Sequence, residues 1–595
     1  FPYTTLFRSL IGPASELDRV RLSGDVQRID ATGKHIYPGL IGANTVMGLM
    51  EIGAAAGLLA SGATAAPRPN FVVIQTDDQP LNEFDRRFRD LYDNWRQIMP
   101  KTMALMRDKG ITFTQYMTPF PLCAPSRATL LSGRYTQNHE VIRIGGPRGG
   151  WQAWQSNPIM FENLPVWLQR SGYRTLHFGK FMNNYGGADA PAETVVPPGW
   201  DRWVTDATDN STREFYGYRQ NIDGIITPRL GWPYYDMDGG RDPEGCPWLG
   251  VEICNYHTDS MSMQAEQAIL QSGDDPFYLQ IDYHTPHGDS RPPIGPEPAP
   301  RHYDTALRTP GPRPPGFNER DISDKPRFLQ DADAAAPLSQ NEINQIDTEY
   351  RKSVEALRSV DDGVGQIIAA LRETGKLSNT YVIYTSDNGF FTGQHRISRG
   401  KLLPYEPALR VPFVIRGPGI KAKTRSYEPV ANQDIAPTII RLADARAALG
   451  IDGRSMIPFW KDPTRRSRRP ILLSSYATIT RLIPGDYPDD PEQPGGTEAR
   501  KRGGATISVK SPDQNYVGIR LGPYKYIRYE SGEIELYVLR EDPAELENRA
   551  ADPVYRPIIR YLDTQLEALR GCKGQSCRNW APLWPQPPGS ITDRK

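Results

Sequence analysis

Two short polar pairs in the sequence follow apolar, strand-like runs and could together bind a hard metal ion. Asp77-Asp78 follows residues 71–75, and Asp387-Asn388 follows residues 381–386. In open α/β sheets the carboxyl ends of parallel strands meet at one edge, where ligands bind. Three carboxylates and one amide at such an edge suit Ca²⁺, with Mg²⁺ as the alternative. Either pair alone is also common turn chemistry, so this prediction depends on the two pairs together.

A third motif, Pro121-Leu-Cys123-Ala-Pro-Ser-Arg127, supplies a cysteine at the start of a helical pattern that ends at Gly133. A thiol at a helix N-terminus beside an arginine is acidified and can act as a nucleophile. The alternative is a buried cysteine that only caps a core helix.

The elements that must position these residues alternate along the chain. Apolar runs that predict strands occur at 71–75, 175–178, 277–282 and 381–386, and helical patterns occur at 97–109, 160–171, 258–272 and 346–374. Strands that alternate with helices predict an α/β fold with a mostly parallel sheet. Residues 290–340 read as a long Pro/Gly-rich loop. Further strands are predicted at 507–509, 516–520, 524–529 and 534–538, followed by a helix at 553–570.

Composition excludes several classes of protein. The 595 residues contain 70 Lys and Arg against 70 Asp and Glu, so the basic excess of a nucleic-acid-binding protein is absent. A mean hydropathy of -0.56 argues against a polytopic membrane protein, and we expect no membrane span. Two close cysteine pairs, Cys246/Cys254 and Cys572/Cys577, could each form a disulfide in an oxidising compartment, which leaves Cys123 unpaired.

The first 66 residues do not fit the rest of the chain, and we expect them to lie outside the folded core. Residues 1–9 resemble a translated sequencing adapter and residues 26–52 resemble the entry strand of amidohydrolases, so residues 1 to about 50 are interpreted as a chimeric artefact. Residues 53–66 resemble the end of an export signal, which predicts an exported, periplasmic or extracellular protein. A disordered extension is the alternative. The sequence has no His-x-His metal pair, so the whole chain is not an amidohydrolase.

The motif Cys123-x-Pro-Ser-Arg127, with Leu131-Ser-Gly133 after it, resembles the signature of type I sulfatases in the alkaline-phosphatase-like superfamily. Further family motifs occur in the family's order between residues 69 and 550. The resemblance implies a large mixed, mostly parallel sheet between helices in a catalytic domain at 67–455. The strands predicted after residue 505 and the helix at 553–570 indicate a smaller C-terminal α+β subdomain at 456–595, with an antiparallel sheet and a terminal helix. A formylglycine-generating maturation enzyme would convert Cys123 to Cα-formylglycine.

The resemblance assigns the metal and the sulfate to named residues. The implied Ca²⁺ ligands are Asp77, Asp78, Asp387, Asn388 and the modified Cys123. Arg127 and Lys180 would hold the sulfate oxygens, because fixed cations stabilise charge on a transferring oxyanion.

Four further positions match residues around the leaving group or the substrate. His287 matches the family's site histidine, with His284 as a competitor, and Lys401 matches the lysine that reaches the leaving group. His395 is expected to line the pocket, unless it is a surface histidine. In the implied mechanism, Asp387 acts as base while a formylglycine hydroxyl attacks sulfur, and His287 or Lys401 protonates the departing alcohol. The remaining hydroxyl then expels sulfate.

Departures from the common arylsulfatase pattern bear on the substrate. Where many arylsulfatases have Lys-Trp-His, this chain has Lys180-Phe-Met-Asn183, so the histidine's role is missing or passes to Asn183. This segment, together with Gln137-Asn-His139, resembles the glucosamine-6-sulfatase branch and favours 6-O-sulfated glucosamine or a related sulfated sugar. His139 is either functional or structural. The alternative substrate class is a generic aryl or alkyl sulfate.

Two rival functions are disfavoured by the same residues. Phosphonate monoester and phosphodiester hydrolases share the cysteine signature but tend to carry Asp-His where this chain has Asp387-Asn388. A non-catalytic glycan-binding relative would have lost the nucleophile or the cations. This chain keeps Cys123, Arg127 and Lys180.

Overall fold

The computed structural model describes the greater part of the chain. The described residues are 67–186, 195–207, 215–227, 230, 256–288, 295–330, 335–447, 450–476, 515–579, 582–586 and 588. Residues 68–595 form one compact unit. The predictions made for residues 1–66, for a strand at 507–509 and for the pair Cys246/Cys254 lie outside the described residues.

A large mixed sheet lies at the centre of this unit, as predicted. Ten strands of the described residues form it, in the order β13-β4-β12-β11-β1-β10-β6-β7-β8-β9. Its inner strands β11, β1, β10, β6 and β7 are parallel, whereas antiparallel pairs occur toward both edges. The bounds are β1 Asn70–Thr76, β4 Ile111–Phe113, β6 Arg174–Gly179, β7 Arg202–Asp206, β8 Gln220–Ile222, β9 Ile225–Ile226, β10 Phe277–Asp282, β11 Thr380–Ser386, β12 Phe413–Arg416 and β13 Thr424–Ser426.

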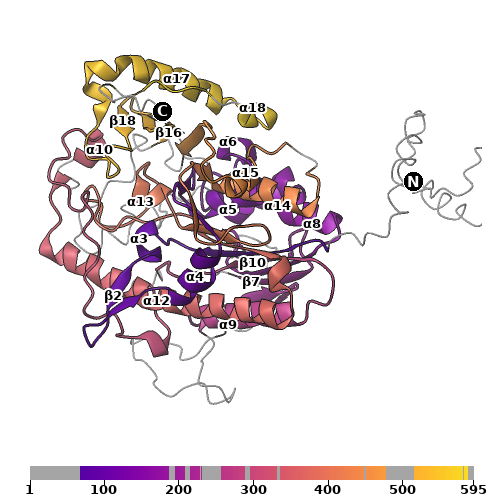
Figure 1. Cartoon of the computed structure of the whole chain (residues 1–595). Helices are drawn as coiled ribbons and strands as arrows, with labels where there is room; N and C mark the ends of the chain where they lie inside the picture. The colour runs from indigo at the N-terminus through magenta and orange to yellow at the C-terminus, as the bar shows by residue number, and fades with distance from the viewer. Residues whose placement is uncertain are drawn as a thin grey trace, which may run out of the picture. The chain divides into compact units, whose positions relative to one another are not determined.

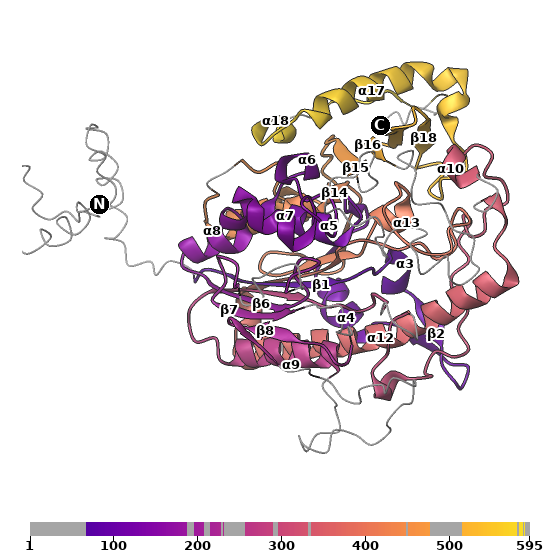
Figure 2. The ribbon, with the colours of Figure 1, turned by 180° about the vertical axis from the view of Figure 1, so that it is seen from behind.

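Helices cover both faces of this sheet, so its inner strands are almost entirely buried and mostly apolar. In Figures 1 and 2, α4 (Pro100–Leu105), α9 (His257–Leu270) and α12 (Gln340–Glu373) lie on one face, and α5 (Cys123–Ser132), α8 (Leu164–Arg170) and α14 (Ile435–Ala443) lie on the other. Alternate residues of β1 enter the two cores. Val72 and Ile74 pack with α9 and α12, while Phe71 and Val73 pack with α8 and α14. Strands buried on both faces read as continuous apolar runs, which is why the sequence predicted them well.

Several predicted helices have different bounds. The helix predicted at 97–109 is shorter in the structure. Residues 95–97 pair as a strand, and α4 begins only at Pro100 and ends at Leu105. The pattern at 160–171 divides into a 3-10 turn and α8, which begins after the Asn163 cap. Helix α12 begins earlier than predicted, because Ser339 and Glu342 form a capping box at its N-terminus. The loop at 290–340 contains the short helix α10 (Arg327–Gln330).

A second sheet near the C-terminus is antiparallel, in the order β15-β16-β17-β18. Its strands are β15 Ile471–Ser475, β16 Tyr516–Leu521, β17 Tyr524–Tyr529 and β18 Ile534–Val538. Helix α17 (Arg556–Arg570) packs Leu562, Leu566 and Leu569 against this sheet (Figure 1). The antiparallel sheet and terminal helix confirm the predicted C-terminal subdomain, although β15 was not predicted. The domain boundary at residue 455 stays a prediction.

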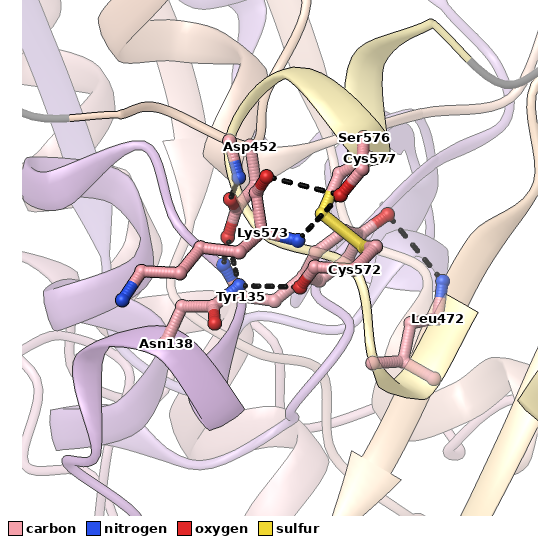
Figure 3. Close-up of a disulfide and its surroundings, with 9 residues drawn as sticks. Tyr135, Asn138, Asp452, Leu472, Cys572, Lys573, Ser576 and Cys577 are labelled. Atoms are coloured by element: carbon pink, nitrogen blue, oxygen red, sulfur yellow. Dashed lines mark hydrogen bonds between the residues drawn. A yellow bond between two sulfur atoms is a disulfide. The ribbon is translucent and has the colours of Figure 1, made fainter. Parts of the chain in front are cut away.

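Cys572 and Cys577 form the predicted disulfide (Figure 3). The small loop that it closes docks on the segment that follows α5. Asn138 donates a hydrogen bond to the Cys572 carbonyl at 3.0 Å, and Asp452 accepts from Asn138 and from the Gly574 amide at 2.8 and 2.6 Å. The disulfide therefore closes the loop 572–577, and the hydrogen bonds of Asn138 and Asp452 attach this loop to the polypeptide just beyond the cysteine motif. Among the described residues, no helix combines the length and the apolar character needed to cross a membrane.

One buried carboxyl group makes the stability of the fold depend on pH. Glu83, in α3 (Leu81–Phe84), is 2% exposed and accepts a hydrogen bond from Ser353 of α12 at 2.6 Å. Burial raises the pKa of Glu83 to about 8, although the Ser353 hydrogen bond opposes the shift and the charge of Asp78 adds to it. The folded protein therefore holds a proton that the unfolded chain loses near pH 4.5.

This stabilisation is fully present below pH 4.5 and is lost as the pH rises through about 8. Glu83→Gln keeps the shape of the side chain and removes the charge, so we expect its Tm to exceed that of the wild type at pH 8. At pH 4.5 the two values should nearly coincide. Thermal melting at both pH values measures this, with Glu373→Gln at an exposed position of α12 as the control. An equal Tm difference at both pH values would contradict the assignment.

Candidate active site

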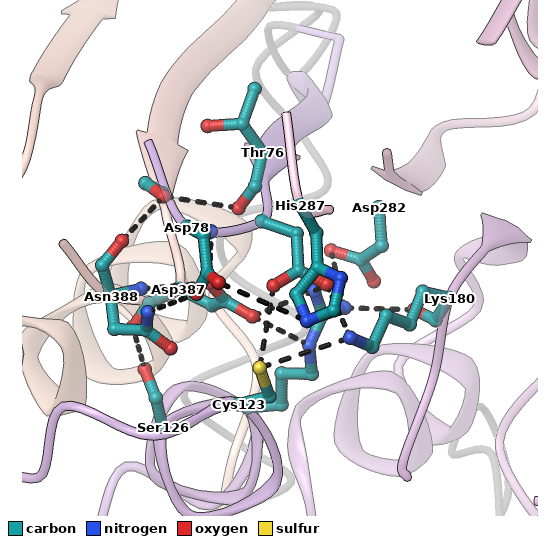
Figure 4. A network of polar contacts seen from close by, with 12 residues as sticks. Thr76, Asp78, Cys123, Ser126, Lys180, Asp282, His287, Asp387 and Asn388 are labelled. Atoms are coloured by element: carbon teal, nitrogen blue, oxygen red, sulfur yellow. Dashed lines mark hydrogen bonds and ion pairs between the residues drawn. The ribbon is translucent and has the colours of Figure 1, made fainter. Parts of the chain in front are cut away.

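The carboxyl ends of three adjacent parallel strands carry the acidic residues of the site. Strand β1 lies between β10 and β11, and it leads directly into Asp77 and Asp78. Strand β11 leads into Asp387 and Asn388, and β10 ends at Asp282. The Asp78 amide donates to the Asp387 carboxylate at 3.2 Å, which joins the two predicted metal-ligand pairs. The predicted meeting of the two pairs at one sheet edge is therefore observed (Figure 4).

Four potential metal ligands gather at this edge. One ligand atom from each of Asp77, Asp78, Cys123 and Asp387 lies within 4.8 Å of the others, and all four residues are buried. The Asn388 side-chain oxygen is also buried and has no hydrogen-bond partner among the described residues. A buried amide oxygen without a partner costs free energy, which a cation at this point would recover. The donors are mainly oxygen atoms, so the residues fit a hard divalent cation.

Cys123 enters this cluster from the first turn of α5. Its Sγ atom lies 3.3 Å from Asp77 Oδ1, 3.0 Å from Lys401 Nζ and 3.8 Å from Lys180 Nζ. The thiol is fully buried. Three residues on in the same helix, Ser126 donates to the Asp387 carbonyl. Helix α5 is thus attached to the end of β11 next to the thiol.

Three cationic side chains balance the three clustered carboxylates. Lys180 Nζ lies 2.5 Å from Asp77, and Lys401 Nζ donates to Asp78 at 2.6 Å. Arg127 donates to Asp387 from Nε and from a terminal nitrogen, at 3.0 and 2.8 Å. The predicted residues Lys180, Lys401 and Arg127 are therefore all brought to the cluster. Arg127 is 2% exposed and points at carboxylates, so its predicted contact with sulfate stays a prediction.

A glycine permits the approach of Lys180. Gly179 ends β6 with φ +98°, and a Cβ at this position would lie 2.1 Å from the Asp282 carbonyl oxygen. That carbonyl accepts a hydrogen bond from the Lys180 amide at 2.9 Å. Only a residue without a side chain fits between the two strands at this point.

Burial and the neighbouring charges shift the pKa values of two carboxyl groups, Asp77 and Asp387, in opposite directions. Burial opposes ionisation of Asp77, but the surrounding cations, Lys180 first among them, hold the pKa of Asp77 well below its ordinary value. Burial, together with the charge of Asp77, raises the pKa of Asp387 to about 6, against the opposing effect of Arg127. Two acidic groups with pKa values pushed apart are typical of sites that bind cations or transfer protons.

The two histidines of His284-Thr-Pro-His287 lie next to each other, with ring centroids 4.9 Å apart. His287 Nε2 is 3.8 Å from Asp78 Oδ2, so His287 faces the carboxylate cluster (Figure 4). His284 packs edge-on against Phe215 at 6.0 Å. The described contacts therefore turn His287 toward the carboxylate cluster, and its role beside the leaving group stays a prediction.

His395 lies in surroundings that differ from those of the carboxylate cluster. His395 is 2% exposed, its Nδ1 lies 2.6 Å from Glu319 Oε2, and its ring lies 4.3 Å from that of Tyr405. His395 is thus not a surface histidine, and the described contacts link it to Glu319 rather than to Cys123. Its role in lining the pocket stays a prediction.

Asn183 is half-buried, and its carbonyl accepts a hydrogen bond from the Trp151 amide at 2.8 Å, which leaves its predicted substrate contact a prediction. Met182, which replaces the histidine of many arylsulfatases, is buried in the core beside α8. His139 is structural, because its ring lies between Thr129 Oγ1 and the Val141 amide at 2.9 and 3.1 Å. Burial lowers the pKa of His139 to about 3, so its ring is neutral.

Two residues that support the side chains of the site were not identified from the sequence. Asp282 Oδ1 lies 3.7 Å from Arg127, and its other oxygen lies 3.0 Å from His177. The position of Asp282 at the end of an apolar strand is the signal that identified Asp77 and Asp387. Asn432 donates to the Ser126 carbonyl and hydroxyl at 3.0 and 2.9 Å. No local pattern marks Asn432, because its partner lies 306 positions away in the chain.

Comparison with known proteins places this geometry in a family. A family model described as Sulfatase matches residues 69–445. An arylsulfatase of Volvox carteri is 32% identical over 89% of this chain and 78% of its own length. The N-acetylglucosamine-6-sulfatase of Homo sapiens is 30% identical over 87% of each chain.

Solved structures share the fold. BT4656, in complex with its substrate D-glucosamine-2-N,6-O-disulfate, has a TM-score of 0.60 at 20% identity, covering 86% of this chain and 98% of its own. A phosphonate monoester hydrolase from Silicibacter pomeroyi also has a TM-score of 0.60 at 20% identity, covering 84% and 95%. At this identity the two structures show the alkaline-phosphatase-like fold and do not separate the two chemistries. The family match and the curated relatives distinguish the two chemistries, because they are sulfatases. The chain therefore belongs to the sulfatase family of sulfuric ester hydrolases.

Proposed function

We propose that this protein hydrolyses 6-O-sulfate esters of glucosamine or related sulfated sugars, with Ca²⁺ bound and Cys123 converted to formylglycine. One observation carries the proposal. The Cys123 side chain enters a buried cluster of carboxylates and lies within 4 Å of the Nζ atoms of Lys180 and Lys401. A group on this side chain would meet an anionic substrate between fixed cations.

The charge balance of the cluster supports an anionic substrate. Asp77, Asp78 and Asp387 are matched one to one by Lys180, Lys401 and Arg127. A divalent cation held by the carboxylates and Asn388 would leave an excess of positive charge, which a sulfate ester group would offset. When bound, Ca²⁺ would supply electrostatic stabilisation of charge on the sulfate oxygens.

Formylglycine at position 123 would supply a hydrated aldehyde with two hydroxyl groups, one to attack sulfur and one to release the enzyme. The residues around Cys123 provide the proton transfers. Asp387, which has a carboxylate oxygen within 4.8 Å of the Cys123 sulfur, would accept a proton on the nucleophile side. His287 and Lys401 both contact Asp78 and can deliver a proton to the departing alcohol.

The substrate assignment rests on the relatives and on the residues after Lys180. Curated relatives include N-acetylglucosamine-6-sulfatases, and the complex of BT4656 contains a 6-O-sulfated glucosamine. Arylsulfatases are also among the relatives, so a generic aryl sulfate is the second candidate. Relatives named as extracellular sulfatases, together with the Cys572–Cys577 disulfide, support an exported protein.

Removal of the Cys123 side chain tests the nucleophile. In Cys123→Ala we expect kcat on N-acetylglucosamine 6-sulfate to fall on the order of 10⁴-fold or more, because the covalent step is lost. Sulfate release measures this in protein produced together with a formylglycine-generating enzyme. The wild type produced without that enzyme is the matched control and should be equally inactive. Full activity of that control would show that an unmodified thiol is sufficient, and preferential turnover of a phosphonate monoester would favour the rival chemistry.

Calcium binding can be measured without catalysis. We expect Ca²⁺ added to chelator-treated protein to raise the Tm, by the equivalent of about 2.7 kcal/mol when its concentration is 100 times Kd. Asp78→Asn removes a ligand charge and should abolish most of this rise. The control is Asp206→Asn, which alters a partly buried carboxylate that pairs with His257 at 2.8 Å outside the cluster. Equal Ca²⁺ responses in both variants would contradict the site, and the same titration with Mg²⁺ identifies the preferred ion.

A further inference from the structure

The loop that carries Lys401 is held in place by the C-terminal sheet. This segment, called here the lysine loop, comprises residues 389–405, between β11 and α13 (Glu406–Leu409). The proposed function requires Lys401 Nζ to stay near the side chain of residue 123, whose Sγ atom lies 3.0 Å from Nζ in this structure. A loop of this length needs external support to fix one side chain, because its own ends do not determine its path.

Leu402, the residue after Lys401, has a backbone conformation that its own side chain disfavours. Its φ is +76°, in the left-handed region that a bulky residue rarely adopts. Two hydrogen bonds hold it there. The Leu402 amide donates to the Pro121 carbonyl at 3.2 Å, and the Leu402 carbonyl accepts from the Tyr516 hydroxyl at 3.0 Å. Pro121 lies two positions before Cys123, so Leu402 joins the loop of the lysine to the loop of the nucleophile.

Tyr516 belongs to a rigid and buried support. It begins β16, is 2% exposed and pairs in register with Ser475 of β15 and Tyr529 of β17. The neighbouring strand β15 contacts the nucleophile side as well, because the Ser474 amide donates to the Pro119 carbonyl at 3.0 Å. The sheet therefore touches both loops that meet at Cys123. Burial raises the pKa of Tyr516 well above its ordinary value, so its hydroxyl remains a donor.

The far end of the lysine loop is attached to the same sheet. The Tyr405 hydroxyl donates to Glu535 of β18 at 2.9 Å. Glu535 also accepts hydrogen bonds from Tyr529 and Tyr537, both at 2.6 Å. This carboxyl is fully buried, and its three tyrosine donors replace the water that it has lost.

We infer that Tyr516 is a positioning residue, whose hydrogen bond to the Leu402 carbonyl aims Lys401 at the leaving group of the substrate. This inference rests on the proposed function, because it assigns Tyr516 an effect on proton delivery by Lys401. Tyr516 acts from the C-terminal sheet and contacts none of the reacting atoms itself. The sheet is thereby part of the catalytic apparatus, in addition to its role in packing against α17.

The test compares two tyrosines of the same sheet. Tyr516→Phe removes the hydrogen bond to the Leu402 carbonyl. Tyr524→Phe removes a hydrogen bond of the same length, 3.0 Å, to the carbonyl of Pro585, which lies far from the lysine loop in the sequence. Activity is measured on N-acetylglucosamine 6-sulfate, whose alcohol needs a proton to leave, and on 4-nitrophenyl sulfate, whose phenolate leaves more easily. In Tyr516→Phe we expect kcat/KM to fall about tenfold more on the sugar sulfate than on the aryl sulfate. In Tyr524→Phe the ratio of the two values should not change.

A double-mutant cycle separates positioning from general destabilisation. If Tyr516 acts through Lys401, Tyr516→Phe should not change the substrate ratio further in a Lys401→Ala background. An unchanged ratio in Tyr516→Phe, or the same change in both backgrounds, would overturn the inference while leaving the proposed function in place. A wild type that hydrolyses neither ester would overturn both. Should Tyr516→Phe fail to fold, Tyr405→Phe, which releases the other end of the loop from Glu535, carries the same expectation.

Discussion

The balance of charge among buried side chains at the end of β1 and β11 is the constraint on which the site depends. Ionised groups removed from water are tolerated only when oppositely charged partners and hydrogen bonds compensate them. Asp77, Asp78 and Asp387 are each matched by a cation that comes from a different part of the chain. Arg127 is supplied by α5, Lys180 by the end of β6, and Lys401 by a long loop. The positions of α5, of the end of β6 and of the long loop therefore all depend on the same cluster of charges.

In the proposed function, this arrangement would favour an anionic substrate only after a cation has entered the site. Without a metal, the paired charges leave little net field for a substrate. Divalent charge at the carboxylates and at the unpaired Asn388 oxygen would release the two lysines to face a sulfate group beside residue 123. Cation binding and substrate binding are thus parts of one electrostatic balance. The antiparallel sheet contributes by fixing Leu402, and through it the lysine that is furthest in sequence from the strand ends.

The sequence identified those site residues whose role is indicated by the strand or helix directly next to them in the chain. Asp77 and Asp387 follow apolar strands that are buried on both faces, and Cys123 opens a helix, so each could be placed from its neighbours alone. Long-range contacts could not be placed in this way. Nothing around Tyr516 indicates that its hydroxyl meets Leu402, 114 positions earlier, and no periodicity shows that His395 pairs with Glu319. The helix predicted at 97–109 was too long at both ends, because residues 95–97 pair with residues 87–89 in a hairpin and residues 107–109 form a separate 3-10 turn.

The central claim is that Cys123 becomes the aldehyde-bearing residue at the centre of this charge balance. Mass spectrometry of the tryptic peptide 110–127, from protein produced together with a formylglycine-generating enzyme, tests it most directly. The account predicts a mass decrease equal to replacement of the CH₂SH side chain by CHO, located at position 123. A peptide that keeps an intact thiol, in protein that nevertheless releases sulfate, would contradict it.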